Sequence, residues 1–564
     1  MKFLITIFIL TILEDDPVKT EDTFPSVETP LGRIDGFLAK TNYGKTFAAF
    51  EGIPYAEPPI GDLKFESPKP VKPWLGVWKA NTMYKCLQYN HFTEPGDDFV
   101  IGEEDCLYVN IYTPVNANKN SNLDVIIFIH GGAFMFNYGG SYGPKIIMDR
   151  NVVYVNFNYR LGPLGFLSTE DEIVPGNVGL RDQILALKFI KDNIQYFGGN
   201  PDSITLTGMS AGGASVHIHY MSPLSKGLFN RGFSQSGCAL NPWVIMENGR
   251  EKALKLADIL GCPTENTKIA VECLKSRPGR QIVDSVKHFL PWLYNPFSPF
   301  GVVVDKASKN PVLPEHPLDL MKKRKVQDLP YIFSHVLEEG LYPAYDFWND
   351  KYLSEIDANW SELIPFVLDY NNTISPGERD EVSKTIREFY LKDKSVNKNT
   401  FKDLVKIVSD RLFISDIQKC ARMQSAAMKS PVYYYHFTYR GKFSKSIVRM
   451  KENLENVGPS HADDTIYVLS STINTQSTPE DKEMCNEFLN MWLSFASNSH
   501  PKLPDDVDWP TVSKDVQDPL IYAEIRSPDD VVILSDDNLG NHKFWSSLPI
   551  NENERILTLI KEEL

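Results

Sequence analysis

SITLTGMSAGGASVHIHY, residues 203–220, reads as a short strand, a tight turn of small residues and a helix. The β-branched run 204–207 is typical of a buried strand. The turn 208–212, GMSAG, matches G-x-S-x-G, a pattern in which a serine stands on a sharp strand-to-helix turn. The glycines permit unusual backbone angles and leave space beside the serine. Ser210 is therefore expected at a helix N-terminus, where free N–H groups favour an oxyanion.

The turn alone does not establish a nucleophile, because a glycine-rich turn can contain a serine by chance. Serine is a weak nucleophile and needs a neighbouring base, usually a histidine oriented by a carboxylate. In chains with this turn the order is serine, acid, histidine. His217 and His219 follow Ser210 on the same helix, too close in sequence to reach back over the turn. The base is therefore expected further downstream.

His461 is the candidate base and EEG, 338–340, contains the candidate acid. His461 lies in GPSHADD, a loop with turn residues and acidic neighbours that follows a predicted strand. The glutamates follow another predicted strand, so a carboxylate there would lie at its C-terminal end. A solvated loop histidine and a surface acidic turn are the alternatives. The residues alone do not choose between Glu338 and Glu339.

Backbone N–H groups are expected to stabilise the oxyanion. Ala211 directly follows the serine and supplies one of them. The glycine-rich HGGA, 130–133, follows the apolar run 125–129 and is the predicted source of the others.

Strands alternate with helices along most of the chain, which predicts an α/β fold with a large, mainly parallel sheet covered on both faces. The segments 246–325 and 351–428 read as mostly helical insertions above the sheet. The further predicted strands are 104–112, 125–129, 152–159, 232–237, 329–336 and 432–438. The predicted crossover helix is 177–196.

Composition predicts a single large domain. Of 564 residues 42% are hydrophobic and 23% charged, and no linker or repeat interrupts the chain. We therefore expect one domain over 17–564. The net charge of −15 argues against nucleic acid or an anionic membrane as a partner.

Both ends of the chain carry possible targeting signals. Lys2 and the apolar run 3–13 predict a signal peptide over about 1–16, too short to span a bilayer. The chain ends in KEEL, 561–564, one residue from the KDEL address that a retention receptor reads, although it equally fits an acidic helix end. No membrane span is expected. The protein is predicted to enter the secretory pathway, and to stay in the endoplasmic reticulum lumen or be secreted.

Sequons and cysteines agree with that route. Asn359 and Asn371 begin Asn-x-Ser/Thr sequons and are predicted glycosylation sites. The short spacings predict disulfides Cys86–Cys106 and Cys262–Cys273. At least one of the three remaining cysteines, Cys238, Cys420 and Cys485, must be unpaired within the chain. No cluster has metal-ligand spacing, so neither a metal nor another cofactor is expected.

Together these motifs resemble the type-B carboxylesterase and cholinesterase family of α/β-hydrolases, with insect general and venom-type carboxylesterases the most similar members. The resemblance runs from about residue 27 to 545. It includes FEGIPYAEPP (50–59), EDCLYVN (104–110), HGGAF (130–134), NYRLGPLGFL (158–167), FGGNP (197–201), TGMSAGGASV (207–216), SQSG (234–237), EEG (338–340) and SHADD (460–464).

The resemblance implies a role for each candidate. It implies a triad of Ser210, Glu339 and His461, and so chooses the second glutamate. It also implies a contact of Ser236 with the acid, a structural ion pair Glu104–Arg160, and the two disulfides predicted above. The implied oxyanion donors are Gly132, Ala133 and Ala211.

Three departures narrow the expected substrate. Met209 precedes the nucleophile, where many members carry Glu, His or Gln, and juvenile hormone esterases typically Gln. Ala133 replaces a glycine, but only its amide is needed. The loop 86–106 has no tryptophan, the residue with which cholinesterases hold choline by a cation–π contact, so choline esters are not expected.

The resulting expectation is a serine esterase that cleaves small to medium apolar carboxylic esters, xenobiotic or lipid-like, through an acyl-enzyme. A juvenile-hormone-type esterase is the first alternative. A non-catalytic adhesion or binding protein on the same fold, and a lipase acting at an interface, are alternatives of other kinds.

Overall fold

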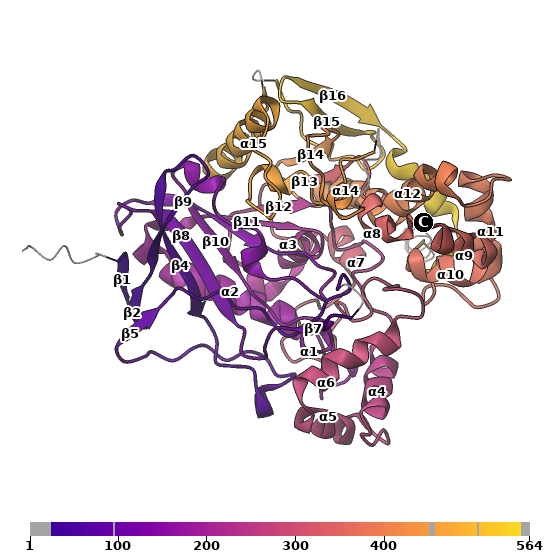
Figure 1. Cartoon of the computed structure of the whole chain (residues 1–564), viewed down its shortest axis with the longest axis horizontal. Coiled ribbons are helices and arrows are strands. Elements are labelled where there is room, and N and C mark those ends of the chain that lie inside the picture. Colours follow the sequence, from indigo (N-terminus) through magenta and orange to yellow (C-terminus); the bar gives the residue numbers. More distant parts are fainter. Residues whose placement is uncertain (1–23, 94–95, 451–456, 505–506, 554–564) are drawn as a thin grey trace, which may run out of the picture.

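A computed structural model of the chain describes residues 24–93, 96–450, 457–504 and 507–553 (Figure 1). The predicted signal peptide and the C-terminal KEEL lie outside these residues.

One large mixed sheet runs through the described part of the molecule, with its central strands parallel and its edges antiparallel. Its eleven strands, in order across the sheet, are β16 (Asp530–Asp536), β15 (Leu520–Ser527), β14 (Val432–Phe437), β13 (Tyr331–Val336), β12 (Arg231–Gln235), β11 (Gly199–Met209), β9 (Leu123–Ile129), β10 (Val153–Phe157), β8 (Tyr108–Pro114), β4 (Thr46–Pro54) and β3 (Phe37–Lys40). Two small sheets flank it, formed by β1 (Ser26–Thr29), β2 (Gly32–Asp35) and β5 (Val77–Lys79), and by β6 (Gln88–Tyr89) and β7 (Val100–Ile101).

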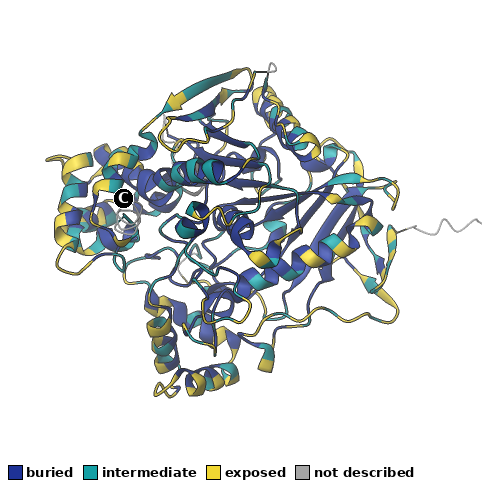
Figure 2. Ribbon diagram, turned by 180° about the vertical axis from the view of Figure 1, so that it is seen from behind, coloured by how far each residue is buried: buried dark blue, intermediate teal, exposed yellow. Residues whose placement is uncertain are grey.

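Helices cover both faces of this sheet because its central strands are apolar on both sides. In β9, Val125, Ile127 and Ile129 belong to the core on the face that α2 (Val178–Asn193) and α3 (Ala211–Met221) cover. The alternating Ile126 and Phe128 belong to the core on the opposite face, covered by α15 (Pro479–Asn498). The period of two places successive side chains on opposite faces. Figure 2 shows the central strands of the sheet as a buried layer, with exposed residues at the edge strands β16 and β3. The predicted α/β architecture is confirmed.

The long insertions form two helical groups beside the sheet, at the lower right and right of Figure 1. The first contains α4 (Gly249–Ile259), α5 (Thr267–Ser276) and α6 (Gly279–Asp284), and α7 (Pro317–Lys322) follows. The stretch 290–316, predicted as mostly helical, holds no helix. The second contains α9 (Asp350–Ala358), α10 (Trp360–Val367), α11 (Arg379–Tyr390), α12 (Phe401–Ser409) and α13 (Ser415–Ala427). The short helices α1 (Gly162–Phe166), α8 (Leu341–Ala344), α14 (Lys445–Met450) and α16 (His542–Ser547) complete the described α-helices.

Both predicted disulfides, Cys86–Cys106 and Cys262–Cys273, are present. Of the two sequons, Asn359 is exposed and Asn371 is half-buried. Within the described residues, no helix combines the length and the apolar character needed to cross a bilayer.

Candidate active site

Ser210 occupies a strained turn between β11 and α3. Its φ of 59° and ψ of −125° lie outside the regions that non-glycine residues ordinarily adopt. A Cβ on Gly212 would stand 1.9 Å from the Ile129 carbonyl oxygen, so only glycine fits there. The Ser210 N–H donates to the Gln235 carbonyl, 2.8 Å, which fixes the turn to the neighbouring strand β12. The backbone therefore holds the Ser210 side chain at the end of β11, 6% exposed.

His461 and Glu339 form a buried hydrogen bond. The His461 Nδ1 and Glu339 Oε2 atoms lie 2.5 Å apart, and the two residues are 3% and 0% exposed. Glu339 Oε1 accepts from the Val336 N–H, 2.9 Å, at the end of β13. A short parallel bridge between Glu338 and Ser460 holds the two loops together. Of the two glutamates, Glu339 is the one that faces the histidine.

The neighbouring Glu338 faces a different partner. Its carboxylate accepts from the Gly458 N–H, and burial raises the pKa of this carboxyl above its usual range. It supports the backbone of the loop that carries His461.

Ser210 and the His461–Glu339 pair lie at the same edge of the sheet. Strands β11, β12, β13 and β14 are parallel neighbours, so their C-terminal ends lie together. Among the described residues, neither the Ser210 hydroxyl nor Nε2 of His461 forms a hydrogen bond. Such contacts are often long in a ligand-free enzyme and shorten when substrate binds.

The HGGA loop lies directly against the serine. A Cβ on Gly131 would stand 2.8 Å from the Cβ of Ser210. Gly132 and Ala133 have positive φ of 111° and 53°, a conformation that non-glycine residues seldom adopt. The Ala133 carbonyl accepts from the Ser298 hydroxyl, 2.8 Å, which anchors the loop. In the described part of the chain, the N–H groups of Gly132, Ala133 and Ala211 donate to no acceptor.

Aromatic rings from separate segments surround the histidine. The His461 ring lies 4.7 Å from the ring of Phe413 and 5.4 Å from that of Tyr342. The Tyr342 ring contacts Phe92 and Phe297 in turn. These residues come from far apart in the sequence, and no local pattern marks any of them, so sequence reasoning missed them.

His91 belongs to the same aromatic cluster. Its ring packs against Phe136, just after the HGGA loop, and Phe297, and neither ring nitrogen has a hydrogen-bond partner in the described structure. Burial lowers the pKa of His91 to about 3, so the ring is neutral.

Two contacts expected from the resemblance are not formed. The Ser236 hydroxyl is buried and has no hydrogen-bond partner among the described residues, so its expected bond to Glu339 is absent. Glu339 instead uses its oxygens for Val336 and His461. The Ser236 backbone has a φ of 52° and donates to the Ser334 carbonyl, 3.0 Å.

The expected Glu104–Arg160 ion pair is wrong. Arg160 binds Asp182 of α2 in a bidentate geometry, at 2.8 Å from Nε and 2.6 Å from Nη2, and Asp182 is fully buried. Glu104, a quarter of whose side chain is exposed, pairs with Lys64 at 3.4 Å. The planar guanidinium of Arg160 faces α2. There the buried carboxylate of Asp182 accepts two parallel hydrogen bonds from it, a geometry that Glu104 does not offer.

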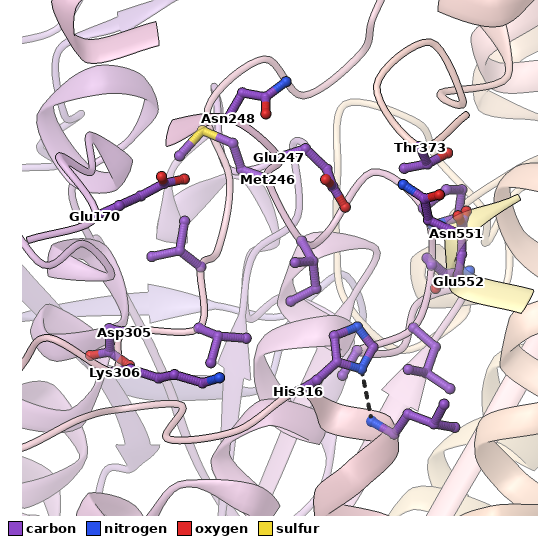
Figure 3. Close-up of a pocket in the computed structure, with 18 of the residues that line it drawn as sticks. Glu170, Met246, Glu247, Asn248, Asp305, Lys306, His316, Thr373, Asn551 and Glu552 are labelled. Carbon is purple, nitrogen blue, oxygen red and sulfur yellow. Dashed lines mark hydrogen bonds between the residues drawn. The ribbon is translucent and has the colours of Figure 1, made fainter. Parts of the chain in front are cut away.

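A separate pocket lies away from Ser210. It measures about 670 Å³ and is lined in part by Met246, Asp305, His316 and Glu552, with neither Ser210 nor His461 among its walls (Figure 3). Asp416 also lines it, and burial raises the pKa of that carboxyl to about 6. The pocket contains charged groups but no arrangement of nucleophile and base.

Comparison with known proteins identifies the class. Residues 23–532 match the model of the carboxylesterase family. The chain is 42% identical to venom carboxylesterase-6 of Apis mellifera, over 94% of this chain and 95% of that protein. It is 41% identical to esterase E4 of Myzus persicae, over 89% and 91%. A crystal structure of juvenile hormone esterase from Manduca sexta, with OTFP covalently attached, superimposes with a TM-score of 0.81 at 27% identity, covering 93% of this chain and 99% of that one.

The fold is therefore that of the α/β-hydrolases, and the chain belongs to the carboxylesterase family. It is a carboxylic-ester hydrolase. The alternative of a non-catalytic binding protein is set aside.

Proposed function

We propose that the chain hydrolyses esters through a Ser210–His461–Glu339 triad. The observation that carries this proposal is the buried hydrogen bond between His461 Nδ1 and Glu339, at the sheet edge where Ser210 stands. An ionised carboxylate only accepts, so Nδ1 carries the proton of this bond and Nε2 carries the lone pair. That lone pair makes His461 the base for the serine hydroxyl.

The reaction then has two halves. The Ser210 oxygen attacks the ester carbonyl carbon while its proton passes to His461 Nε2, and the negative charge that develops on the carbonyl oxygen is accepted by the amides of Gly132, Ala133 and Ala211. The alcohol leaves with the proton from His461, which leaves an acyl group on Ser210. Water then attacks the acyl carbon with His461 as base, and the acid departs.

Small to medium apolar esters, xenobiotic or lipid-like, are the proposed substrates. The rings of Phe413 and Tyr342 beside His461, and of Phe297 beyond them, supply an apolar surface for such groups. The loop 86–106 lacks a tryptophan for a choline cation.

A juvenile-hormone-type esterase is the second candidate. The structural similarity to juvenile hormone esterase of Manduca sexta favours it, whereas Met209 before the nucleophile favours a general esterase. Relative kcat/KM values for a juvenile hormone and for short aryl esters separate the two, because a hormone esterase would prefer the hormone by orders of magnitude.

We also propose that the protein enters the secretory pathway. Its two disulfides are typical of an oxidising compartment. Expression with and without residues 561–564 tests retention: if KEEL is read as an address, only the truncated form accumulates in the medium, and equal secretion of both forms would identify it as a helix end.

Covalent trapping tests the triad. An organophosphate should add once per chain, and peptide mass mapping should place the adduct on Ser210 with loss of esterase activity. An active protein whose adduct maps to another residue would overturn the proposal.

A further inference from the structure

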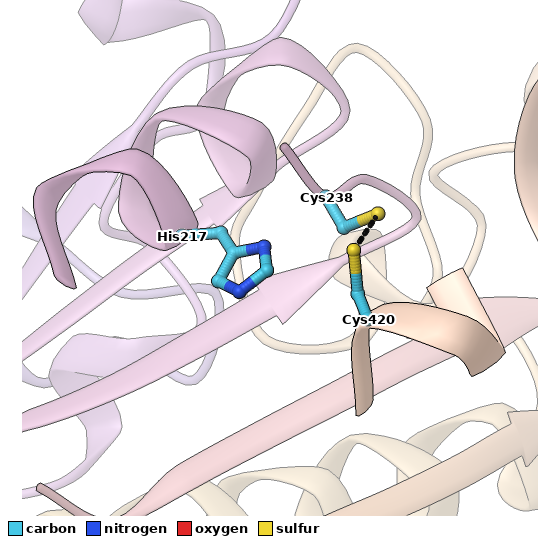
Figure 4. Close-up of side chains that lie close together, drawn as sticks. All are labelled: His217, Cys238 and Cys420. Carbon is cyan, nitrogen blue, oxygen red and sulfur yellow. Dashed lines mark hydrogen bonds between the residues drawn. The ribbon is translucent and has the colours of Figure 1, made fainter. Parts of the chain in front are cut away.

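Two cysteines that lie far apart in the sequence meet in the core. The Sγ atoms of Cys238 and Cys420 lie 2.6 Å apart, and both residues are fully buried (Figure 4). A disulfide bond measures about 2.05 Å, whereas even carbon atoms that are not bonded to each other prefer about 3.5–4.0 Å. Sulfur is larger than carbon. The separation therefore lies much nearer to a covalent bond than to a contact between two thiols.

A metal ion is the alternative occupant, because His217 also lies within 4.8 Å of both sulfurs. The hydrogen bonds of His217 argue against this reading. Its Nδ1 lies 3.2 Å from the Ala239 N–H, which can only donate, so Nδ1 carries the lone pair and is occupied. Its Nε2 faces the Gln424 side-chain oxygen at 3.3 Å. A structural zinc site needs four ligands, and here the described residues offer two free ones.

The cysteine pair joins two segments that support the candidate active site. Cys238 comes two residues after Ser236, and a Cβ on the intervening Gly237 would stand 2.2 Å from the Ser210 carbonyl oxygen. Cys420 lies on α13, which continues from the segment that contains Phe413, the ring packed on His461.

Hydrogen bonds join the same two segments. The Asn241 side chain donates to the Leu412 and Phe413 carbonyls, 3.0 and 3.1 Å, and Trp243 Nε1 donates to the Leu412 carbonyl, 2.8 Å. A covalent link at Cys238–Cys420 would fix the position of this contact relative to both Ser210 and His461.

We propose that Cys238 and Cys420 form a third disulfide, which positions the Phe413 segment against the active site and leaves Cys485 as the free thiol. The bond forms when the two thiols lose two protons and two electrons to the disulfide of a thiol–disulfide oxidoreductase, which is reduced to two thiols. Cys485 is buried beside Thr475, and burial raises its pKa to about 12, so it is a poor partner for exchange.

Peptide mapping of the secreted protein tests the bond. The unfolded, unreduced protein is alkylated, digested and analysed by mass spectrometry. We expect one alkylated cysteine, Cys485, and one linked peptide pair containing Cys238 and Cys420. Alkylation of Cys238 and Cys420 in protein whose Cys86–Cys106 bond is intact would overturn the proposal. Zinc at one equivalent per chain, lost when C420A is introduced, would overturn it in favour of a metal site.

Kinetics of C238A/C420A test the positioning role, with C485A as the matched control. We expect the double variant to melt about 5 °C lower, and, well below its melting temperature, to lose several-fold in kcat with KM little changed. C485A should keep the wild-type kcat. A double variant with lowered stability and unchanged kcat would show that the bond is structural only. If wild-type protein has no esterase activity, the triad fails instead, and the mapping result still decides the disulfide.

Discussion

Among the residues that the structure describes, two pairs of a carboxylate with a basic side chain are buried at both partners, Arg160–Asp182 and His461–Glu339. They differ in which polar atoms remain without a hydrogen bond. Arg160 gives Asp182 two side-chain hydrogen bonds and its backbone N–H, 3.0 Å, and also donates to the Glu66 carbonyl, 2.9 Å. His461 gives Glu339 a single bond, and its second ring nitrogen faces no partner in the described structure. In the first pair, both partners use their polar atoms on each other and on nearby backbone. In the second pair, Nε2 of the histidine is left for the proton transfer that we propose.

The difference shows that burial of a charged pair does not by itself mark an active site. A guanidinium only donates hydrogen bonds, so the Arg160–Asp182 pair offers no basic atom for catalysis. A histidine changes its charge in that range, and its carboxylate partner fixes which nitrogen is basic. The pocket near Met246 and His316 shows that volume does not mark an active site either. It has space for a ligand, but its walls contain no nucleophile beside a base.

The largest effect is expected for S210A. Without the attacking oxygen, kcat/KM for a short aryl ester should fall by about 10⁵–10⁶, while the melting temperature stays near that of wild type, since alanine keeps the Cβ and the packing of the turn. A stopped assay with purified protein measures it. Retention of a tenth of the activity would exclude Ser210 as the nucleophile.

E339Q should have the next largest effect, a loss of about 10³–10⁴ in kcat, because glutamine no longer fixes the histidine tautomer or stabilises its charged form. E338Q is the matched control at the adjacent position. It should lose far less, since the Glu338 carboxylate accepts from the Gly458 N–H and makes no hydrogen bond to His461 in the described structure. Equal losses in the two variants would contradict the assignment of the acid.

D182N tests the Arg160–Asp182 pair and should act on stability. It leaves the buried Arg160 without its full counter-charge, so the free energy of unfolding should fall by about 3–5 kcal/mol, measured by urea denaturation. The kcat of the folded variant should stay near wild type. D202N, at an exposed ion pair with Lys191, is the control and should leave stability unchanged. A large kcat loss in folded D182N would link this pair to catalysis.

Asp464 predicts a pH dependence of stability. Burial raises the pKa of this carboxyl to about 6. The hydrogen bonds from Tyr435 and Gln235 lower the pKa, but the effect of burial is larger. A carboxyl whose pKa is higher in the folded state stabilises the protein below its unfolded value of 3.8, and this contribution is lost as the pH rises to about 6.

D464N lacks that titration. Relative to wild type, its free energy of unfolding should therefore increase by about 2.4 kcal/mol between pH 4 and pH 7. D202N should follow wild type over the same range. A constant difference between D464N and wild type at all pH values would contradict the raised pKa.

The smallest effect is expected in the large pocket. A307W places a bulky ring at its exposed rim, and kcat/KM should stay within about twofold of wild type. A tenfold loss would place this pocket on the path of the substrate.

The sequence predicts the parts of this fold whose cause is local. The apolar run in β9 and the small-residue turn at Ser210 can be recognised from the sequence alone, and both lie where predicted. Interaction partners that depend on how distant segments pack cannot be recognised in this way. Arg160 pairs with Asp182 because α2 packs beside it, and nothing near Glu104 in the sequence reveals that.

The same limit applies to the site. Composition cannot separate Glu338 from Glu339, because only the curvature of the chain after β13 decides which one faces His461. The Phe413 ring comes from the second insertion and the Tyr342 ring from the short helix α8 after β13, and their meeting at His461 depends on tertiary packing alone. The β15–β16 hairpin was likewise missed, since its strands are only half apolar at the sheet edge.

The most direct test is the rate at which an organophosphate labels Ser210 in wild type, E338Q and E339Q, followed by mass spectrometry of the serine peptide. If the His461–Glu339 pair activates Ser210, wild type and E338Q label at similar rates, and E339Q labels at least about a hundredfold more slowly. Labelling of Ser210 in E339Q at the wild-type rate would contradict the account.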